Sequence, residues 1–386
     1  MRLGDICTIK YGKDHKKLND GDIPLYGSGG VMRHVEKALW SKPSVLIPRK
    51  GTLGNLFFVN KPFWTVDTCF WTDIDEEQVL PEYLFYQLKT KDLASLNVGT
   101  AVPSLTTDVL NEVQIDLPSL EKQKQVVEML GSLDSKIEIN TQLNGYLEEL
   151  CECLAAHESG TKTEIMQLCS LVSEKVPCNE AVLNTYVSTE SLLSDKRGRQ
   201  RASSLPRTGK VTVYRSSDVL ISNIRPYFKK IWFADCDGTC SGDVLVFRAK
   251  NPLLAPYLYS ILHADSFFEF VMKGAKGTKM PRGDKRQMLT YQAASSPRQD
   301  TIASTTILTE QIAINDREND KLTALRDVIL PKLMSGEIDV SKIDFTQLNS
   351  HLVQRDSVRS KPVDDVFLDQ SFSLRAGANI CSFTCR

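Results

Sequence analysis

Basic side chains gather in two segments in the second half of the chain. Residues 185–230 hold ten Lys or Arg against three Asp or Glu, and residues 273–286 hold six against one. Cations at this density suit contact with a polyanion, because each one can neutralise a phosphate. Aromatic residues lie in or beside the first segment: Tyr214, Tyr227, Phe228 and Trp232. The alternative is a solvated loop beside core aromatics. The net charge of the whole chain is only −1, so the basic character is local.

The chain lacks the sequence patterns of common catalytic sites. The run from Gly274 to Lys279 has the wrong spacing for an ATP-binding loop, and Asn251-Pro252-Leu253 lacks the second proline and the aromatic of an amino-methyltransferase pocket. The glycines of Gly27–Gly30 follow no strand-to-helix pattern, which favours a turn. We therefore expect no enzyme activity and no cofactor. An enzyme that binds a nucleotide at Gly27–Gly30 remains an alternative.

The cysteines and the apolar runs indicate the cellular setting. No stretch approaches eighteen apolar residues, and Met1–Asp5 lacks the apolar core of a signal peptide. We expect a cytoplasmic protein without membrane contact, whose ten cysteines are reduced thiols. Cys151 and Cys153 would point apart on a helix, and Cys236-x3-Cys240 has no further ligand nearby, so no metal site is predicted.

A long helix is predicted over residues 118–159. Apolar residues and two asparagines recur there in alternating steps of four and three, the spacing of a helix that pairs along its length: Val126, Leu130, Leu133, Ile137, Asn140, Asn144, Leu147, Cys151 and Leu154. A second stripe on a neighbouring face consists of Ile139, Leu143, Tyr146 and Leu150. One partner helix cannot cover both faces. We expect the asparagines on the seam to fix its register; the alternative is a set of polar gaps in a loose coil.

The second half of the chain repeats the first. Residues 312–325 match residues 137–150 at an offset of 175, with Asn315 and Asn319 in the places of Asn140 and Asn144. Residues 218–222 match 44–48 at 174, and residues 277–281 match 99–103 at 178. A period this long indicates a duplicated domain followed by a helix.

These patterns predict a mixed α+β protein made of two similar globular modules and two long helices. The expected ranges are a first module over 1–117, the helix over 118–159, a second module over 164–294, a second helix over 297–336 and a disordered tail over 344–386. Within the first module, buried strands are expected at 45–47 and 57–59 and a helix at 81–88. Pro331 should kink or end the second helix, and Gly336 should close it.

Several motifs resemble the specificity subunits of type I restriction-modification systems over about residues 1–343. They are Leu3–Ile6, Pro48–Gly54, Leu117–Gln123, Leu133–Ile137, Met280–Lys285 and Leu325–Gly336. The resemblance implies two target-recognition domains that each read one half of a bipartite DNA site. It also implies that the two helices pack as an antiparallel coiled coil with pseudo-two-fold symmetry and set the spacing. Two methyltransferase subunits would dock on these helices, and motor-nuclease subunits would complete the complex.

The resemblance also suggests which residues meet these partners. Residues expected to contact double-stranded DNA are Lys13, Arg49, Lys50, Lys61, Arg225, Lys229, Lys230, Lys276, Lys279 and Arg282. Residues expected to bind partner subunits are Ile139, Leu143, Tyr146, Leu150, Leu325 and Val328. The sequence does not sort the basic residues into those that contact phosphates and those that read bases.

The chain departs from the family pattern in two places. The usual apolar start of the second helix is replaced over Ala293–Thr306, and the tail after Phe345 has no counterpart. Two other functions therefore stay open. One is a scaffold whose modules bind protein rather than DNA, and the other is a silent copy of a specificity subunit that does not assemble.

Overall fold

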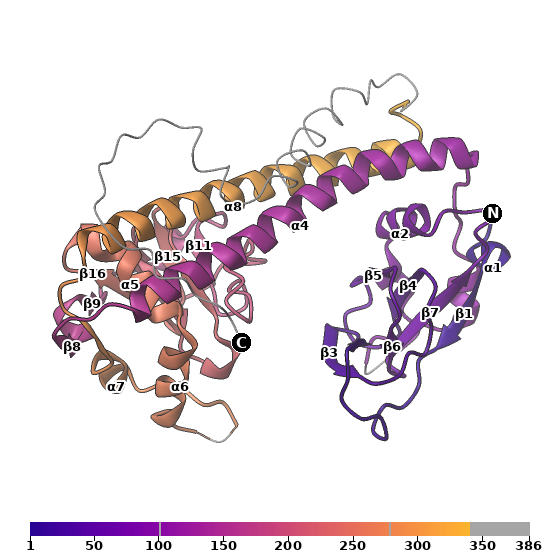
Figure 1. The fold of residues 1–386 in the computed structure, drawn as a ribbon. Coiled ribbons are helices and arrows are strands. Elements are labelled where there is room, and N and C mark those ends of the chain that lie inside the picture. The colour runs from indigo at the N-terminus through magenta and orange to yellow at the C-terminus, as the bar shows by residue number, and fades with distance from the viewer. Residues whose placement is uncertain (100–101, 278, 340–386) are drawn as a thin grey trace, which may run out of the picture. The chain divides into compact units, whose positions relative to one another are not determined.

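The computed structural model describes residues 1–99, 102–277 and 279–339 (Figure 1). The predicted tail over 344–386 lies outside the described residues. The chain divides into two compact units, one formed by residues 1–129 with the residues from Val328 onward and the other by residues 130–327. Each unit contains one module and part of both long helices, and each is described by itself.

The first unit is built on a four-stranded antiparallel sheet with the strand order β1-β7-β4-β5. Its strands are β1 (Cys7–Tyr11), β7 (Cys69–Ile74), β4 (Ser44–Pro48) and β5 (Phe57–Val59). A smaller sheet has the order β3-β2-β6, with β3 (Gly30–Val35), β2 (Ile23–Gly27) and β6 (Trp64–Thr65). All five residues of β4 are buried, because this strand lies inside the sheet and its side chains are covered on both faces.

The helices of the first unit are short: α1 (Leu3–Ile6), α2 (Pro81–Lys89), the 3₁₀ turn η1 (Leu93–Leu96) and α3 (Thr107–Asn111). Pro81 starts α2 at a position where no backbone N–H is needed, and Leu84 and Leu88 are fully buried. The structure confirms the predicted strands at 45–47 and 57–59 and the predicted helix at 81–88. Gly27–Gly30 forms the predicted turn, which joins β2 to β3.

The second unit repeats this plan. Its main sheet has the order β9-β16-β13-β14, formed by β9 (Cys169–Leu171), β16 (Val244–Ala249), β13 (Val219–Ser222) and β14 (Ile231–Phe233). Its second sheet, β10-β12-β15-β11, contains β10 (Lys175–Pro177), β12 (Lys210–Tyr214), β15 (Gly238–Cys240) and β11 (Tyr186–Val187). A third, two-stranded sheet pairs β17 (Gln292–Ala294) with β8 (Lys162–Glu164).

Helices complete the second module: α5 (Ala255–His263), α6 (Asp265–Lys273) and α7 (Lys285–Leu289), with the 3₁₀ turns η2 (Ile165–Gln167), η3 (Cys178–Glu180), η4 (Pro226–Phe228) and η5 (Pro252–Leu254). Tyr257, Phe247 and Phe267 lie at the centre of its core. Tyr214 and Trp232 are also buried, so the structural alternative considered for these two aromatics is correct. Tyr227, by contrast, is exposed.

The sequence repeat is present in the fold. The helices α2 and α5 start 174 residues apart, at Pro81 and Ala255, and α3 and α7 start 178 residues apart. The main-sheet strand orders β1-β7-β4-β5 and β9-β16-β13-β14 correspond strand for strand. In each module, one strand of the second sheet is parallel to its neighbour, β2 to β6 and β11 to β15. The two modules are therefore two versions of one fold.

The long helices α4 (Leu120–Ala156) and α8 (Gln299–Met334) run antiparallel within the second unit (Figure 1). Asp134 binds Arg326 at 2.7 Å, whereas Glu158, just beyond the other end of α4, accepts a hydrogen bond from Thr301. Residue numbers therefore fall along α8 as they rise along α4.

Four asparagines at the helix interface make two equivalent pairs. Asn140 Nδ2 donates to Asn319 Oδ1 at 3.0 Å, and Asn315 Nδ2 donates to Asn144 Oδ1 at 2.7 Å. In the sequence repeat, Asn140 corresponds to Asn315 and Asn144 corresponds to Asn319. The two pairs are therefore equivalent, as expected of a two-fold interface. These bonds form only in one alignment of the helices, which supports the predicted role in register.

The N-terminal part of α8 is packed by threonines. Thr301, Thr305 and Thr309 are buried one turn apart, and the hydroxyls of Thr305 and Thr309 donate to carbonyls one turn earlier. A buried hydroxyl satisfied in this way is tolerated where an apolar residue was expected. Near its other end, α8 continues past Pro331 to Met334, so of the two predicted effects of Pro331 an end of the helix is wrong, and a kink stays a prediction. Gly336, with φ +75°, follows the end as predicted.

Candidate nucleic-acid interface

Three of the predicted basic residues of the first module meet at one edge of its main sheet. β1 and β4 end there and the antiparallel strand β7 begins there, because Tyr11 pairs with Phe70 and Pro48 pairs with Cys69. The chain beyond these ends carries Lys13, Arg49 and Lys50. We name this region, with Tyr11 and Gly51, the first edge.

Arg49 is held in place at the first edge. Its backbone N–H donates to Thr68 O at 2.8 Å, and its Nη1 donates to Asp67 O at 3.2 Å. The guanidinium carbon lies 5.1 Å from the centre of the Tyr11 ring, a cation–π arrangement. Tyr11 itself is 50% exposed, so cation and ring together reach the surface.

Lys61 does not belong to the first edge. Val59 at the end of β5 pairs with Ser44, at the opposite end of β4 from Arg49. Lys61 follows two residues later and is exposed. No sequence pattern signals this separation, because strand register decides it.

The second module carries its basic residues at the equivalent edge. Lys276 and Arg282 pair across a turn, each backbone N–H donating to the other residue's carbonyl at 2.9 Å. Arg225, three residues beyond β13, donates its N–H to Pro281 O at 2.9 Å. Lys279 lies within the same turn and is exposed. We name the group of Arg225, Lys276, Lys279 and Arg282 the second edge.

Acidic residues hold several cations in and around the second edge. Lys276 pairs with Asp284 at 2.9 Å and Arg282 with Asp243 at 3.2 Å, whereas Lys229 pairs with Asp265 at 3.0 Å. The hydrogen bond from Lys276 lowers the pKa of Asp284 below its usual value. Among the described residues, Arg225 and Lys279 have no carboxylate within ion-pair distance.

Lys230 stabilises the module internally. Its Nζ donates to Thr189 O at 2.6 Å and lies 6.0 Å from the centre of the Phe228 ring. Burial lowers the pKa of this amine. The predicted role of Lys230 in DNA contact therefore has less support than that of Arg225 or Lys279.

Sequence reasoning missed Tyr11 as a member of the first edge. Its position beside Arg49 results from the pairing of strands that are far apart in the sequence, and no local pattern signals it. The αL backbone of Arg225, with φ +55°, was also missed. The offset of 174 between residues 51 and 225 was the available signal, because it aligns Arg225 with a glycine.

A network of buried polar groups ties the second module to α4. His263 Nδ1 contacts Glu152 Oε1 at 2.6 Å, and Lys196 Nζ binds the same oxygen at 2.8 Å. Burial opposes protonation of His263, yet hydrogen bonds with Glu148 and Glu152 raise its pKa overall. The His263 ring is therefore held beside two carboxylates of α4, which anchors α4 to α5.

The second stripe of α4 is exposed. Together with the two further residues predicted to bind partner subunits, its members are between 41% and 68% exposed: Ile139, Leu143, Tyr146, Leu150, Leu325 and Val328. The seam residues Leu130 and Cys151 of the same helix are buried. Neighbouring apolar side chains that face outward on a helix are typical of a protein-binding surface.

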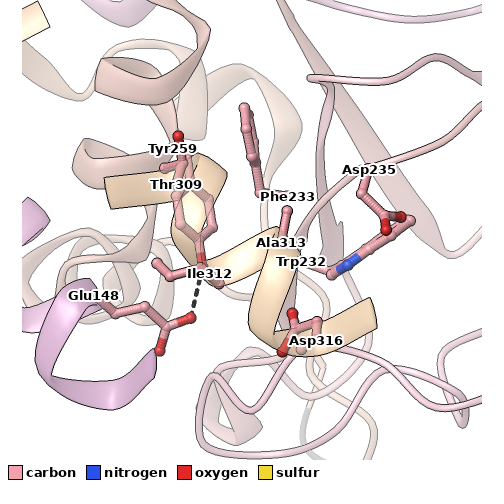
Figure 2. A pocket seen from close by; sticks show the side chains of 10 residues that line it. Glu148, Trp232, Phe233, Asp235, Tyr259, Thr309, Ile312, Ala313 and Asp316 are labelled. Carbon is pink, nitrogen blue, oxygen red and sulfur yellow. Dashed lines mark hydrogen bonds between the residues drawn. The ribbon is translucent and has the colours of Figure 1, made fainter. Parts of the chain in front are cut away.

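A small cavity of about 30 Å³ lies between α8 and the second module (Figure 2). Glu148, Asp235 and Asp316 line it, and Tyr259 donates a hydrogen bond to Glu148 at 3.0 Å. Burial and these neighbouring carboxylates raise the pKa of Asp316 to about 7. A cavity this small and this acidic suits neither a phosphate nor a nucleotide.

Two further properties concern the described part of the chain alone. No helix there is long and apolar enough to cross a membrane. No group of three or more His, Cys, Asp or Glu side chains is arranged there to hold a metal ion.

Comparison with known proteins gives a consistent family. Residues 1–149 match the type I restriction modification DNA specificity domain. The specificity subunit of the type I restriction enzyme MjaIX from Methanocaldococcus jannaschii is 28% identical over 158 residues, which cover 35% of this chain and 36% of that protein. The HindI specificity subunit from Haemophilus influenzae is 34% identical over 83 residues, covering 20% and 18%. The chain thus spans about a third or less of each of these two relatives.

Among solved structures, the S subunit of a type I restriction-modification system from M. genitalium covers 86% of this chain and 95% of its own, with 15% identity and a TM-score of 0.47. The family match over residues 1–149 and both curated relatives thus make this chain similar to specificity subunits of type I restriction enzymes.

Proposed function

We propose that this chain is the non-catalytic subunit that directs a type I methyltransferase and endonuclease complex to a bipartite DNA site. The main support is that the same sheet edge occurs twice and carries Arg and Lys each time, with Arg49 and Lys50 in one module and Arg225 and Lys279 in the other. Two similar modules that present cations at the same edge of the main sheet suit two half-sites of one duplex. This function places the chain in the cytoplasm, where its DNA substrate lies.

Duplex DNA, two methyltransferase subunits and motor-nuclease subunits are the partners of this function. The exposed second stripe of α4, with Leu325 and Val328, provides an apolar surface for the methyltransferase subunits. Catalysis and its cofactors belong to those partners. The long helices α4 and α8 set the spacing between the half-sites.

The function is tested by co-expressing the chain with adenine methyltransferase subunits of a related system and mapping methylated positions on genomic DNA. Methylation at a two-part site with an unread spacer is expected. A complex that assembles but binds duplex with no dependence on salt supports the scaffold function instead. A chain that folds but captures no methyltransferase subunit supports the silent copy.

Docking is tested on the second stripe. The double variant Leu143→Asp with Tyr146→Asp should fold but not bind methyltransferase subunits, because it leaves charges unpaired in an apolar interface. Gln142→Asp, on the same helix and also exposed, is the matched control and should bind normally. Loss of folding in the double variant, with a normal control, would show that the second stripe belongs to the core of this chain.

Spacing is tested by lengthening both helices. Seven residues inserted after Asn144 in α4 and seven inserted just before Asn315 in α8 lie at the same level of the antiparallel pair, because Asn144 bonds to Asn315. They keep the seam in phase and add roughly 10 Å to each helix. The unread spacer should grow by up to about three base pairs while both half-sites stay the same. Changed half-sites with an unchanged spacer would contradict the role of the helices.

A further inference from the structure

The backbone at the second edge has an unusual conformation. Arg225 has φ +55° and Lys229 has φ +49°, and the two residues flank the single turn η4. Positive φ places Cβ of an L-residue close to the following carbonyl, so residues other than Gly, Asn and Asp rarely adopt it. Such strain persists only where the surrounding structure holds it, and it is concentrated at functional sites.

The first module shows what the backbone alone requires. The residue equivalent to Arg225 is Gly51, with φ +89°. The Gly51 N–H donates to Pro103 O at 3.1 Å, just as the Arg225 N–H donates to Pro281 O at 2.9 Å. The same turn therefore forms in both modules, and glycine forms it without strain. An arginine in this position lowers the stability of the fold. Its side chain is the only feature that it adds to the turn.

That side chain has no competing ionic partner among the described residues. Nearby Lys229, Lys276 and Arg282 are all held by carboxylates, whereas no carboxylate lies within ion-pair distance of Arg225. Its backbone is fixed on both sides, since Phe228 N donates to Arg225 O at 3.0 Å. A planar guanidinium on a rigid backbone is suited to a bidentate contact, which a flexible lysine does not provide.

We propose that Arg225 reads a guanine in the half-site of the second module, donating to O6 and N7 in the major groove, while Lys276, Lys279 and Arg282 contact phosphates. This inference rests on the proposed function. The bidentate contact of arginine with guanine is the commonest specific contact to a base, and it distinguishes guanine from the other bases because only guanine presents both acceptors. The proposal separates base reading from phosphate binding within one group of cations.

The experiment uses the full chain assembled with methyltransferase subunits and three variants of one residue. Arg225→Gly removes the guanidinium and suits the positive φ, and Arg225→Asn does the same with a residue that tolerates this backbone. Arg225→Lys keeps the charge but removes the planar fork. Thermal melting checks that each variant is folded. Methylated sites are mapped for each complex, and duplex affinity is measured over a range of salt concentrations.

For all three variants we expect one guanine position in one half-site to become degenerate, with roughly ten- to hundredfold loss of preference for guanine. The other half-site should be unchanged. The salt dependence of the Arg225→Lys complex should equal that of the wild type, whereas Lys279→Ala should lower the slope by about one and relax no position.

If the Arg225 variants bind every DNA sequence more weakly and keep their preference at every base position, Arg225 is a phosphate contact. That result overturns this inference and leaves the proposed function standing. The inference is also overturned if the folded Arg225→Gly complex methylates the same sites with unchanged preference. A wild-type complex that directs no methylation to a two-part site overturns the proposed function, and this inference with it.

Discussion

The first and second edges share a backbone but differ in the side chains that it carries. At the first edge the turn is made by Gly51, and the guanidinium comes from Arg49, which lies over the Tyr11 ring. At the second edge the guanidinium sits on the turn itself, at Arg225, and the neighbouring Lys276 and Arg282 are paired with acids. The fold thus fixes where a side chain is presented, and substitution within the turn changes what is presented. That division suits a protein whose two modules share an architecture but read different half-sites.

Asp243 and Asp284 partly neutralise the positive charge of the second edge. Asp243 pairs with Arg282 and Asp284 pairs with Lys276, so under the proposed function a duplex has to compete with these two carboxylates. The Lys276 and Arg282 side chains of these pairs are exposed, so solvent screens the pairs and they contribute little to stability. Under the proposed function they weaken the attraction of the second edge to DNA of any sequence. At the first edge, Arg49 binds a backbone carbonyl and an aromatic ring, and none of the described cations there pairs with a carboxylate.

The largest expected effect concerns the shared core. Ile47 and Ile221 occupy equivalent places in β4 and β13, and both are buried. Ile47→Ala and Ile221→Ala should each lower the free energy of unfolding of their own unit by about 2–5 kcal/mol, through lost burial and a residual cavity. Calorimetry of each variant should show one shifted transition and one unshifted. A single shared transition that moves equally in both variants would show that the two units unfold together.

A second prediction concerns the cations of the second edge. Replacing Lys276, Lys279 and Arg282 together by Ala should weaken duplex binding of the assembled complex and lower the salt slope by up to about three. Titrations at several salt concentrations measure this slope. Lys61→Ala is the comparison at the other end of the first module's sheet, where an unchanged slope is expected. An unchanged slope in the triple variant, or a reduced slope in Lys61→Ala, would place the duplex elsewhere.

The long helices differ at Asp316 and its sequence counterpart Thr141, and pH should reveal this difference. The pKa of Asp316 is about 7 in the folded chain against 3.8 for an ordinary Asp, because of burial and the nearby Glu148, Asp235 and Asp320. The folded state therefore binds more protons between these values, so the free energy of unfolding should fall as pH rises from about 4 to about 7. Asp316→Asn should remove this part of the pH dependence and melt at a higher temperature above pH 7. If the melting temperatures of the wild type and of Asp316→Asn change with pH in the same way across this range, the raised pKa of Asp316 is contradicted.

The smallest effect is expected from Gly51→Arg, which makes the first edge resemble the second. Among the described residues, Ser28 Oγ at 3.7 Å is the only atom within 4 Å of the site of the new Cβ, so the Cβ itself meets no clash there. The positive φ should lower the free energy of unfolding by about 1–2 kcal/mol. Methylation mapping should show a new preference for guanine in the half-site of the first module. A variant with the same loss of stability and no new preference would show that the turn at this edge faces away from the bases.

The strands, the paired helices and the duplication could be predicted because their signals are local or periodic. The runs at 45–47 and 57–59 are apolar and bounded by turn residues, and the helix seam repeats over several turns. The membership of each edge could not be predicted, because it depends on which strands pair and in what register. Lys61 shows this most clearly, since pairing of Val59 with Ser44 carries it away from Arg49.

The threonines of α8 show another limit of sequence patterns. Replacement of the expected apolar residues over Ala293–Thr306 predicts a less regular helix, yet α8 is continuous from Gln299. The hydroxyls of Thr305 and Thr309 are satisfied by the helix backbone, and this bonding is invisible in a pattern of polar and apolar residues. Pro331 is a second such case, because it lies in the last turn of α8 and the helix continues through it to Met334.

Replacement of the second module by a copy of the first tests the central claim most directly. A chain in which residues 1–117 stand in place of residues 164–294 keeps both helices and presents the first edge twice. If each module reads one half-site and the helices pair antiparallel, methylation mapping of the assembled complex should yield a site whose two halves are the same sequence in opposite orientation. A site that keeps the original second half would show that the module does not read it.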